Sequence, residues 1–317
     1  GKGGFGTVYR GTLLPRPGSL AGPREVAVKE VVASGKEAEV QQIFTDFQQE
    51  VFLMSELGSH PNLVNLLGVS LQPRPRMVLE LLPGGDLYQL LHPNEPDEDA
   101  PPVEGAEEAA ISMIPEEEFP WTLRLRIALD IAKGMYGMHS HSPAILHRDL
   151  RSPNIFMVCR DAAAPVRAKV ADFGLSRLVA PSVTGSLETW QWLAPEVQGH
   201  TKEEGYDTSS DVYSFAVCCW ELVSRGFPFQ EYMQDPRFCR LNESTGLLYP
   251  DLHKLKAAIA HGGLRPSLPE RLAGEANASG EYDACPAPFA GLIESCWHQD
   301  RAQRPSFREV VLLLSDM

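Results

Sequence analysis

The chemically densest stretch of this chain has the sequence Leu-His-Arg-Asp-Leu-Arg-Ser-Pro-Asn and ends at Asn154. It sets one carboxylate, Asp149, between two arginines, with the Asn154 carboxamide five residues further on. A second acid, Asp172, opens an Asp-Phe-Gly turn that follows a strand-like Lys-Val-Ala. Two acids and an amide at the ends of adjacent strands can hold divalent cations beside a chain of phosphates. The spacing therefore indicates phosphate chemistry assisted by a metal ion.

A glycine-rich segment at the start of the chain is a second candidate phosphate site. Gly1 to Gly6 has the sequence Gly-Lys-Gly-Gly-Phe-Gly, a pattern that dinucleotide-binding domains also use. In those domains a helix follows the last glycine, whereas here Thr7-Val8-Tyr9 favours a strand. We therefore interpret the segment as a glycine hairpin whose backbone N–H groups contact phosphates, which disfavours a nucleotide-dependent oxidoreductase. A tight turn without a ligand is the alternative.

Two charged residues are expected to meet near this hairpin. The alternating segment 25–31 predicts a strand that carries Lys29. Apolar residues within 40–57 recur at helical spacing and place Glu50 on the buried face of a helix. Because an unpaired buried carboxylate is costly, Lys29 is the expected partner of Glu50. Glu39, at the start of the helix, is the weaker candidate, and an exposed Glu50 is the alternative.

The rest of the chain predicts further strands and helices and two segments without regular structure. Strands are expected at 63–69 and 77–82, and helical periodicity runs from Trp121 to His139. A strongly apolar helix is expected from about Ser210 onward. Two segments rich in loop-forming residues, near 235–250 and 273–286, are interpreted as insertions.

Composition restricts the class of protein. The 317 residues carry a formal net charge of −14, which disfavours nucleic acid or an anionic membrane as the main partner. Ten of the acids lie in the segment 92–118, which contains no Lys or Arg. We interpret that segment as a disordered, solvated insertion, with a specific docking role as the alternative.

The sequence also leads to expectations about the cellular location of the protein and about its other domains. The six cysteines show no metal-ligand spacing and fit reduced thiols of a cytoplasmic protein. No apolar run approaches the roughly 20 residues that span a membrane, and no signal peptide opens the chain. Because the sequence starts inside a motif and without Met, we expect it to be one part of a larger protein with other domains.

Together the motifs resemble the catalytic core of the protein kinases. The stretches His-Arg-Asp-Leu-Arg-Ser-Pro-Asn, Lys-Val-Ala-Asp-Phe-Gly-Leu-Ser and Trp-Gln-Trp-Leu-Ala-Pro-Glu resemble the tyrosine-kinase-like group, most closely amoebal kinases of the Roco type. The resemblance covers the whole chain, 1–317, and implies a two-lobed α+β kinase fold. Residues 1–82 would form a mainly β N-lobe and hinge, with one key helix and a truncated first strand. Residues 83–317 would form a mainly α C-lobe.

The resemblance assigns a role to each matching position. Asp149 would orient a substrate hydroxyl and accept its proton, and Lys29 would bind the α- and β-phosphates of ATP. The implied catalytic residues are Lys29, Glu50, Asp149, Arg151 and Asn154. The implied ATP-binding residues are Gly1, Lys2, Gly3, Gly4, Phe5, Gly6, Val8, Ala27, Lys29, Leu79, Glu80, Leu82 and Phe156. Among these, Leu79 is the implied gatekeeper, and Glu80 and Leu82 would contact adenine through their backbones.

Metal, structural and regulatory residues follow from the same resemblance. Asn154 and Asp172 would hold Mg²⁺. The implied structural residues are Asp211, Glu196 and Arg304, the last two as a buried ion pair. The implied regulatory residues are Arg148, Thr184, Ser186 and Thr189. Arg148 would pair with a phosphorylated residue of the loop 172–196, so loop phosphorylation is expected to raise activity.

The implied substrates are ATP and a protein hydroxyl. Thr189 favours serine or threonine, whereas Arg151 and Trp192 resemble tyrosine kinases, and we favour serine or threonine. The alternative is a pseudokinase that binds ATP or a partner as a scaffold. The presence of Lys29, Asp149 and both candidate metal ligands favours catalysis.

Overall fold

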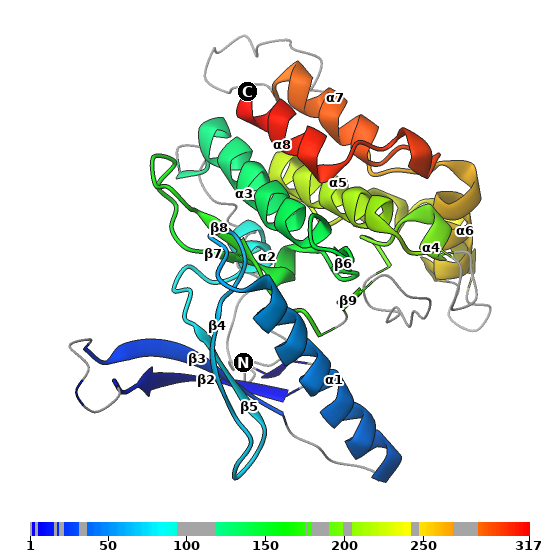
Figure 1. Ribbon diagram of the computed structural model, residues 1–317. Coiled ribbons are helices and arrows are strands. Elements are labelled where there is room, and N and C mark those ends of the chain that lie inside the picture. Colours follow the sequence, from blue (N-terminus) through cyan, green and yellow to red (C-terminus); the bar gives the residue numbers. More distant parts are fainter. Residues whose placement is uncertain are drawn as a thin grey trace, which may run out of the picture.

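The computed structural model describes residues 2–3, 6–15, 18, 22–31, 37–93, 118–174, 176–178, 190–198, 205–241, 247–268 and 285–317. The described part divides into a β-rich N-terminal lobe and a helical C-terminal lobe (Figure 1). The predicted two-lobed α+β architecture is therefore confirmed. Of the acidic segment 92–118, residues 94–117 lie outside the described residues. None of the described helices combines the length and the hydropathy that crossing a membrane requires.

The N-terminal lobe is an antiparallel sheet with the strand order β1-β2-β3-β5-β4. Its strands are β1 (Lys2–Gly3), β2 (Gly6–Leu13), β3 (Arg24–Glu30), β4 (Leu66–Ser70) and β5 (Arg76–Glu80). The strand predicted at 63–69 thus begins later, because residue 63 instead forms a parallel bridge with Val170 of the other lobe. That bridge joins the two lobes directly behind the candidate site.

Helix α1 (Glu37–Leu57) packs beside this sheet and starts three residues before the predicted helix. Its buried apolar residues Phe47, Leu53 and Met54 recur at helical spacing, which explains why the helix keeps one face inward. The same apolar core continues without a break into the helices of the C-terminal lobe. One core therefore fixes α1, and with it Glu50, relative to both lobes.

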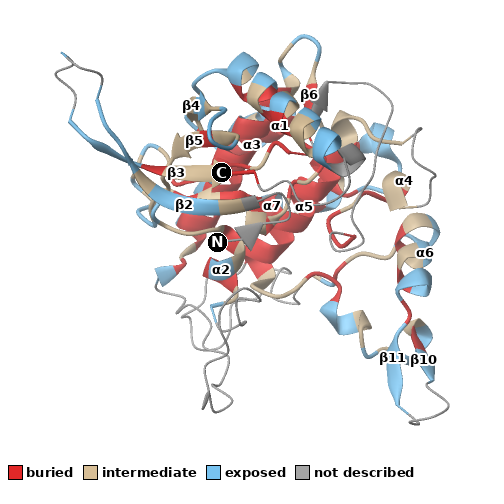
Figure 2. Cartoon of the chain, turned by 90° about the horizontal axis from the view of Figure 1, so that it is seen from below, coloured by how far each residue is buried: buried red, intermediate tan, exposed pale blue. Residues whose placement is uncertain are grey.

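The C-terminal lobe is built around α5 (Thr208–Ser224), in which every residue from Ser210 to Val223 is buried (Figure 2). Helix α3 (Trp121–His139) has the predicted bounds and packs against α5 and α8. The remaining helices are α2 (Leu87–Leu91), α4 (Pro195–Gln198), α6 (Leu252–Gly262), α7 (Ala287–Cys296) and α8 (Phe307–Ser315). A capping box at Asp207 and Ser210 starts α5 beside the candidate catalytic loop.

Four short strands lie between the lobes and carry the candidate site. They are β6 (Ile145–Leu146), β7 (Ile155–Met157), β8 (Ala168–Val170) and β9 (Arg177–Leu178). The pairs β7–β8 and β6–β9 are both antiparallel. The Asp149 loop connects β6 to β7, and Asp172 follows β8, so pairing of β7 with β8 places both acids at the same edge.

The described residues of one segment interpreted as an insertion include a pair of strands. Residues 239–241 and 248–250 form a hairpin, β10 (Cys239–Leu241) and β11 (Leu248–Pro250), which projects beyond α6 (Figure 2). Short 3-10 turns at 230–232 and 236–238 precede it. The other such segment, 273–286, is described only from residue 285 onward.

Candidate active site

The ammonium group of Lys29 lies between two carboxylates from different parts of the chain. Its Nζ is 2.7 and 3.0 Å from the Glu50 carboxylate oxygens and 3.3 Å from Asp172 Oδ1. Burial opposes the charge on Lys29, but Asp172 and Glu50 together raise its pKa above the ordinary value. Burial raises the pKa of Glu50, and Lys29 opposes that shift. The structure therefore brings Lys29, Glu50 and Asp172 into one buried cluster, whereas the side chain of Glu39 lies outside the described residues.

The backbone of the catalytic loop is held by a carboxylate from helix α5. Asp211 accepts hydrogen bonds from the backbone N–H groups of His147 and Arg148, both at 2.9 Å, and from the Tyr206 hydroxyl at 2.6 Å. Its Oδ2 is also 2.8 Å from His139 Nε2. Arg148 has a φ of 69°, an uncommon conformation for a residue with a side chain. Asp211 stabilises this strained turn, as expected; the acid that caps α5 is Asp207 instead.

Asp149 is fixed by the two polar residues that follow it. Asn154 Nδ2 donates to the Asp149 carbonyl oxygen at 2.8 Å and to its carboxylate at 2.9 Å. Arg151 Nε donates to the same carboxylate at 3.3 Å. Burial raises the pKa of Asp149, while Arg151 and His147 oppose the shift. A carboxylate with a raised pKa and fixed orientation is suited to accepting a proton from a hydroxyl group.

The Asp-Phe-Gly turn is attached to the catalytic loop on its buried side. His147 Nε2 is 3.0 Å from the Ala171 carbonyl oxygen, and the buried Phe173 ring lies 5.8 Å from the His147 ring. Asp172 adopts a φ of 63°, and its Oδ1 accepts a hydrogen bond from the Gly174 N–H at 3.3 Å. Burial opposes ionisation of Asp172, yet Lys29 holds its pKa below the ordinary value. Asp172 is therefore ionised and able to bind a cation.

The residues predicted to hold a metal fit a magnesium ion. Asn154 commits its amide nitrogen to Asp149, which leaves its side-chain carbonyl oxygen available to a metal ion, and Lys29 keeps Asp172 ionised. The described residues contain no group of three or more His, Cys, Asp or Glu that could form a complete metal cage. Magnesium is commonly bound by one or two protein oxygens together with substrate phosphates and water. The side-chain oxygens of Asn154 and Asp172 form a donor set of this kind.

Some of the residues predicted to bind ATP lie in strands around the cluster of Lys29, Glu50 and Asp172, and others lie outside the described residues. Val8 pairs with Lys29, and Ala27 pairs with Leu79, so these residues share the inner strands of the sheet. The backbone of Lys2, Gly3 and Gly6 forms β1 and the start of β2. Gly1, Gly4 and Phe5 lie outside the described residues.

The backbone N–H of Glu80 in the predicted hinge has a partner within the chain. The Glu80 N–H already donates to the Asn65 carbonyl oxygen at 3.1 Å, so only the Glu80 carbonyl can contact an adenine. Leu82 is half-buried at the end of the hinge. Gly84 then donates to the Met157 carbonyl oxygen at 3.1 Å, where a Cβ would approach that oxygen to 2.5 Å. Glycine is therefore required where the hinge passes over β7, next to Phe156.

A buried ion pair beside the hinge was not predicted. Lys169 Nζ donates to Glu80 Oε1 at 2.6 Å, and the backbone and side-chain nitrogens of Asn65 donate to the same oxygen at 2.8 Å. Lys169 pairs through its backbone with Phe156 and precedes Asp172 by three residues. The signal in the sequence was a lysine inside an apolar strand, which requires a partner when buried.

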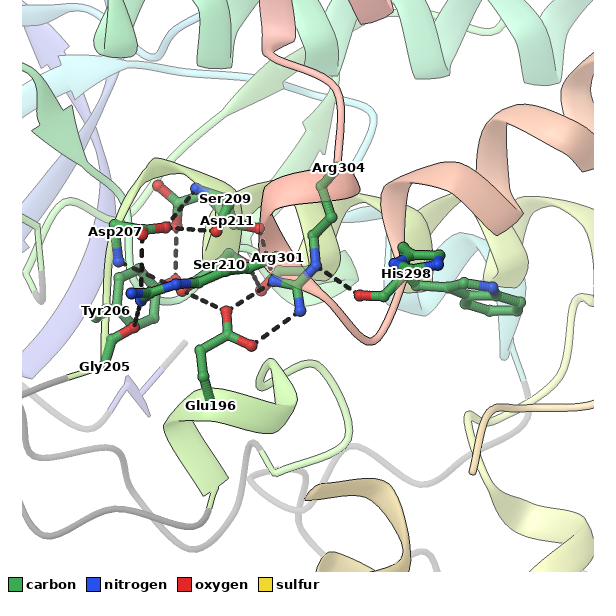
Figure 3. A network of polar contacts seen from close by, with 12 residues as sticks. Glu196, Gly205, Tyr206, Asp207, Ser209, Ser210, Asp211, His298, Arg301 and Arg304 are labelled. Carbon is green, nitrogen blue, oxygen red and sulfur yellow. Dashed lines mark hydrogen bonds and ion pairs between the residues drawn. The ribbon is translucent and has the colours of Figure 1, made fainter. Parts of the chain in front are cut away.

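The second predicted ion pair joins α4 to the segment before α8. Arg304 donates to the Glu196 carboxylate at 2.7 and 2.8 Å (Figure 3). The same guanidinium donates to the carbonyl oxygens of Ser209 and His298, and Ser210 Oγ donates to Glu196 at 2.9 Å. Arg304 therefore connects α4, the start of α5 and the 298–304 turn, which matches the structural role expected for it.

The regulatory positions are described in part. Thr184, Ser186 and Thr189 lie outside the described residues. Arg148 is buried, with its guanidinium 5.7 Å from the centre of the Tyr206 ring. The predicted pairing of Arg148 with a phosphorylated loop residue stays a prediction.

Comparison with known proteins agrees with this geometry. Residues 1–259 match the model of the family described as protein tyrosine and serine/threonine kinase. The chain belongs to this kinase family. The prediction of a protein kinase domain, and of an enzyme of that class, is thereby confirmed.

The kinase domain is also similar to individual proteins of Dictyostelium discoideum. It is 35% identical over 317 residues to probable serine/threonine-protein kinase roco11, covering 100% of this chain and 17% of that protein. It is 34% identical to probable serine/threonine-protein kinases qkgA and pats1, in each case over 98% of this chain and over 18% and 8% of those proteins. The predicted similarity to amoebal Roco-type kinases is confirmed. The chain spans less than a fifth of each of these relatives.

Proposed function

We propose that this kinase domain transfers the γ-phosphate of ATP to a serine or threonine hydroxyl of a protein substrate. The observation that carries the proposal is the cluster in which Lys29 contacts Glu50 and Asp172, beside a loop in which Asn154 and Arg151 fix Asp149. Phosphoryl transfer depends mainly on positioning and on neutralising charge, and this cluster provides groups for both.

ATP would bind between the lobes. Lys29 would contact the α- and β-phosphates, and its two carboxylate partners hold its ammonium group in place. The Glu80 carbonyl and the Leu82 backbone would contact the adenine edge, with Val8, Ala27, Leu79 and Phe156 around the ring. The backbone N–H groups of residues 1–6 would lie over the phosphates.

Asn154 and Asp172 would hold Mg²⁺, which supplies positive charge that neutralises the phosphates. Asp149 would orient the attacking hydroxyl and accept its proton. Arg151, now paired with Asp149, can reach the γ-phosphate with a guanidinium group that donates two parallel hydrogen bonds.

Serine or threonine specificity is supported by the names of the relatives, which are probable serine/threonine-protein kinases, and by Thr189. A tyrosine substrate is the competing proposal, which Arg151 and Trp192 support. The short coverage of the relatives supports other domains in the complete protein, and six free cysteines support a cytoplasmic location. Phosphorylation of Thr184, Ser186 or Thr189 would order the loop through Arg148 and raise activity; unmodified loop residues in active protein, seen by mass spectrometry, would argue against this.

The proposal is tested by measuring phosphate transfer from labelled ATP to dephosphorylated casein. Asp149→Asn is expected to lower kcat by about 10²- to 10⁴-fold, the range for removal of a general base. Asp161→Asn changes an exposed aspartate and serves as the matched control. Equal transfer by the parent and Asp149→Asn would remove Asp149 from its role, and nucleotide binding without any transfer would favour the scaffold alternative. Phosphoamino-acid analysis that finds phosphotyrosine alone would overturn the substrate class.

A further inference from the structure

A second buried carboxylate lies below the catalytic loop, and sequence reasoning gave it no role. Glu221, in the middle of α5, is 0% exposed. Its Oε1 accepts a hydrogen bond from Ser152 Oγ at 2.6 Å, and its Oε2 accepts one from Trp192 Nε1 at 2.8 Å. Both partners lie outside α5, one in the catalytic loop and the other in the segment that leads into α4.

The Ser152 contact acts on the residues that fix Asp149. Ser152 is fully buried and begins the 3-10 turn that ends at Asn154. It directly follows Arg151 and lies two residues before Asn154, the two side chains that hydrogen-bond the Asp149 carboxylate. A displacement of Ser152 therefore moves both groups that orient Asp149.

The Trp192 contact acts on the segment before α4. The Trp192 side chain is almost fully buried and lies edge-on to Phe227, with ring centres 6.2 Å apart. Ser214 Oγ donates to the Trp192 carbonyl oxygen at 2.7 Å. Glu196, four residues later, is fixed by Arg304. This segment ends the loop 172–196 and leads directly into α4.

The two contacts use one oxygen each of the Glu221 carboxyl group. An indole N–H can only donate, so Oε2 must accept, whereas a hydroxyl can donate or accept, so the Ser152 contact can form in either protonation state of the carboxyl group. The charged side chain that affects Glu221 from the catalytic loop is Arg151, and the thiols of Cys218 and Cys219 face it from its own helix. Burial raises the pKa of both thiols well above the ordinary value, so they are neutral.

We infer that the segment before α4 flanks the protein substrate, and that Glu221 is a positioning residue that couples this segment to the catalytic loop, so that a protein hydroxyl is presented to Asp149. The inference deepens the proposed function and rests on it. Glu221 touches neither ATP nor the reacting atoms and acts through Ser152 and Trp192.

A kinetic test separates protein-substrate positioning from nucleotide binding. Glu221→Leu removes both acceptors and is expected to lower kcat/KM for dephosphorylated casein by at least about tenfold, because the loss of one buried hydrogen bond already has roughly that size. The KM for ATP should change less than about twofold, because uniform nucleotide binding is untouched. Glu221→Gln keeps an acceptor for the indole, and its amide can donate to Ser152 Oγ. It should recover most of the activity.

Trp220→Phe is the matched control, because it removes the indole hydrogen bond that the neighbouring residue of α5 makes with the Ser267 carbonyl oxygen. It is expected to leave kcat/KM for casein near the parental value. Parental kinetics of a folded Glu221→Leu variant would overturn the inference. An equal change in the KM for ATP would overturn it as well, since that is the signature of general destabilisation.

An NMR measurement tests the coupling without requiring activity. The indole N–H signal of Trp192 is assigned by its loss in Trp192→Phe. Ser152→Ala, which removes no contact with Trp192 itself, is expected to shift that signal in the parent and to leave it unshifted in the Glu221→Leu background. An unshifted signal in both backgrounds would overturn the coupling. If the parent transfers no phosphate, the proposed function fails, and this experiment still decides whether Glu221 couples the two segments.

Discussion

Glu50 in α1 and Glu221 in α5 are both buried glutamates, but their partners differ. The Glu50 carboxylate lies 2.7 Å from the ammonium group of Lys29, whereas Glu221 accepts hydrogen bonds from a hydroxyl and an indole. Burial raises the pKa of both carboxyl groups. For Glu221, the hydrogen bonds and Arg151 offset burial only in part, and the pKa reaches about 8.

The difference shows two ways in which this domain uses a buried acid. The Lys29 pair keeps a charge between the lobes, where in the proposed function it would meet the phosphates of ATP. The Glu221 site keeps two neutral donors in place, and its carboxyl can hold a proton near neutral pH. A cation in contact with the carboxylate therefore distinguishes the site that binds charge from the site that positions backbone segments.

Removing the cation from the first site is expected to have the largest effect. Lys29→Met leaves Glu50 beside Asp172 without a counter-charge. Glu50 would then resemble Glu221, which has no cation in contact with its carboxyl group. We expect phosphate transfer to fall by at least about 100-fold, because the variant loses preorganised charge at the phosphates. Measured kcat for casein phosphorylation checks this, with the exposed Lys133→Met as control. Transfer within a few-fold of the parent would contradict the assignment.

Breaking the ion pair between Glu196 and Arg304 tests whether a buried pair also stabilises the folded state. Arg304 has no exposed side-chain area, and Arg304→Met leaves Glu196 without its partner. The expected loss is about 3–5 kcal/mol in the free energy of unfolding, typical of one partner removed from a buried pair. Urea denaturation followed by circular dichroism measures it. Arg237→Met breaks an equally short but exposed pair with Asp235, and should change stability little.

The pH dependence of stability sharpens the comparison at Glu221. Its folded pKa of about 8 lies above the ordinary value of 4.5, so the folded state binds more protons between these values. The Glu221 contribution to stability is therefore fully present below about pH 4.5 and is lost as the pH rises toward 8. Relative to Glu221→Gln, the parent should lose about 1.4 kcal/mol for each pH unit in this window.

Thermal or urea unfolding of the parent and Glu221→Gln at pH 5, 6, 7 and 8 gives this difference directly, because other groups cancel. Glu294→Gln, an exposed change in α7, should show no such trend. Parallel stability curves for the parent and Glu221→Gln would mean that Glu221 is ionised throughout.

The hinge ion pair is expected to give the smallest effect. Lys169 and Glu80 are both about nine-tenths buried, and Asn65 donates two further hydrogen bonds to Glu80. We expect Lys169→Met and Glu80→Gln each to raise the KM for ATP by about three- to tenfold. The double variant should raise the KM by less than the two single effects multiplied together, because the two residues contact each other. A fully additive double variant would show that the pair does not act as a unit at the nucleotide site.

Much of the fold was readable along the chain because it depends on local periodicity. Helix α3 has the predicted bounds since apolar residues recur every three to four positions between Pro120 and Ser140. The partner of Glu50 was predicted from the cost of an unpaired buried charge. The hairpin β10–β11 was missed, because its short strands lie among turn-forming residues and carry no clear alternation.

The sequence by itself determined the candidate catalytic groups, because the Asp149 loop and the Asp172 turn place residues of the required type at fixed short spacing. It also determined that a buried Glu50 needs a cationic partner. Only the tertiary structure decided that Glu80 meets Lys169, 89 residues away, and that Glu221 meets Ser152 and Trp192 across 69 and 29 residues. Such contacts depend on how β8, α5 and the catalytic loop pack together, and a single buried Glu or Lys in a sequence identifies the need for a partner without identifying the partner.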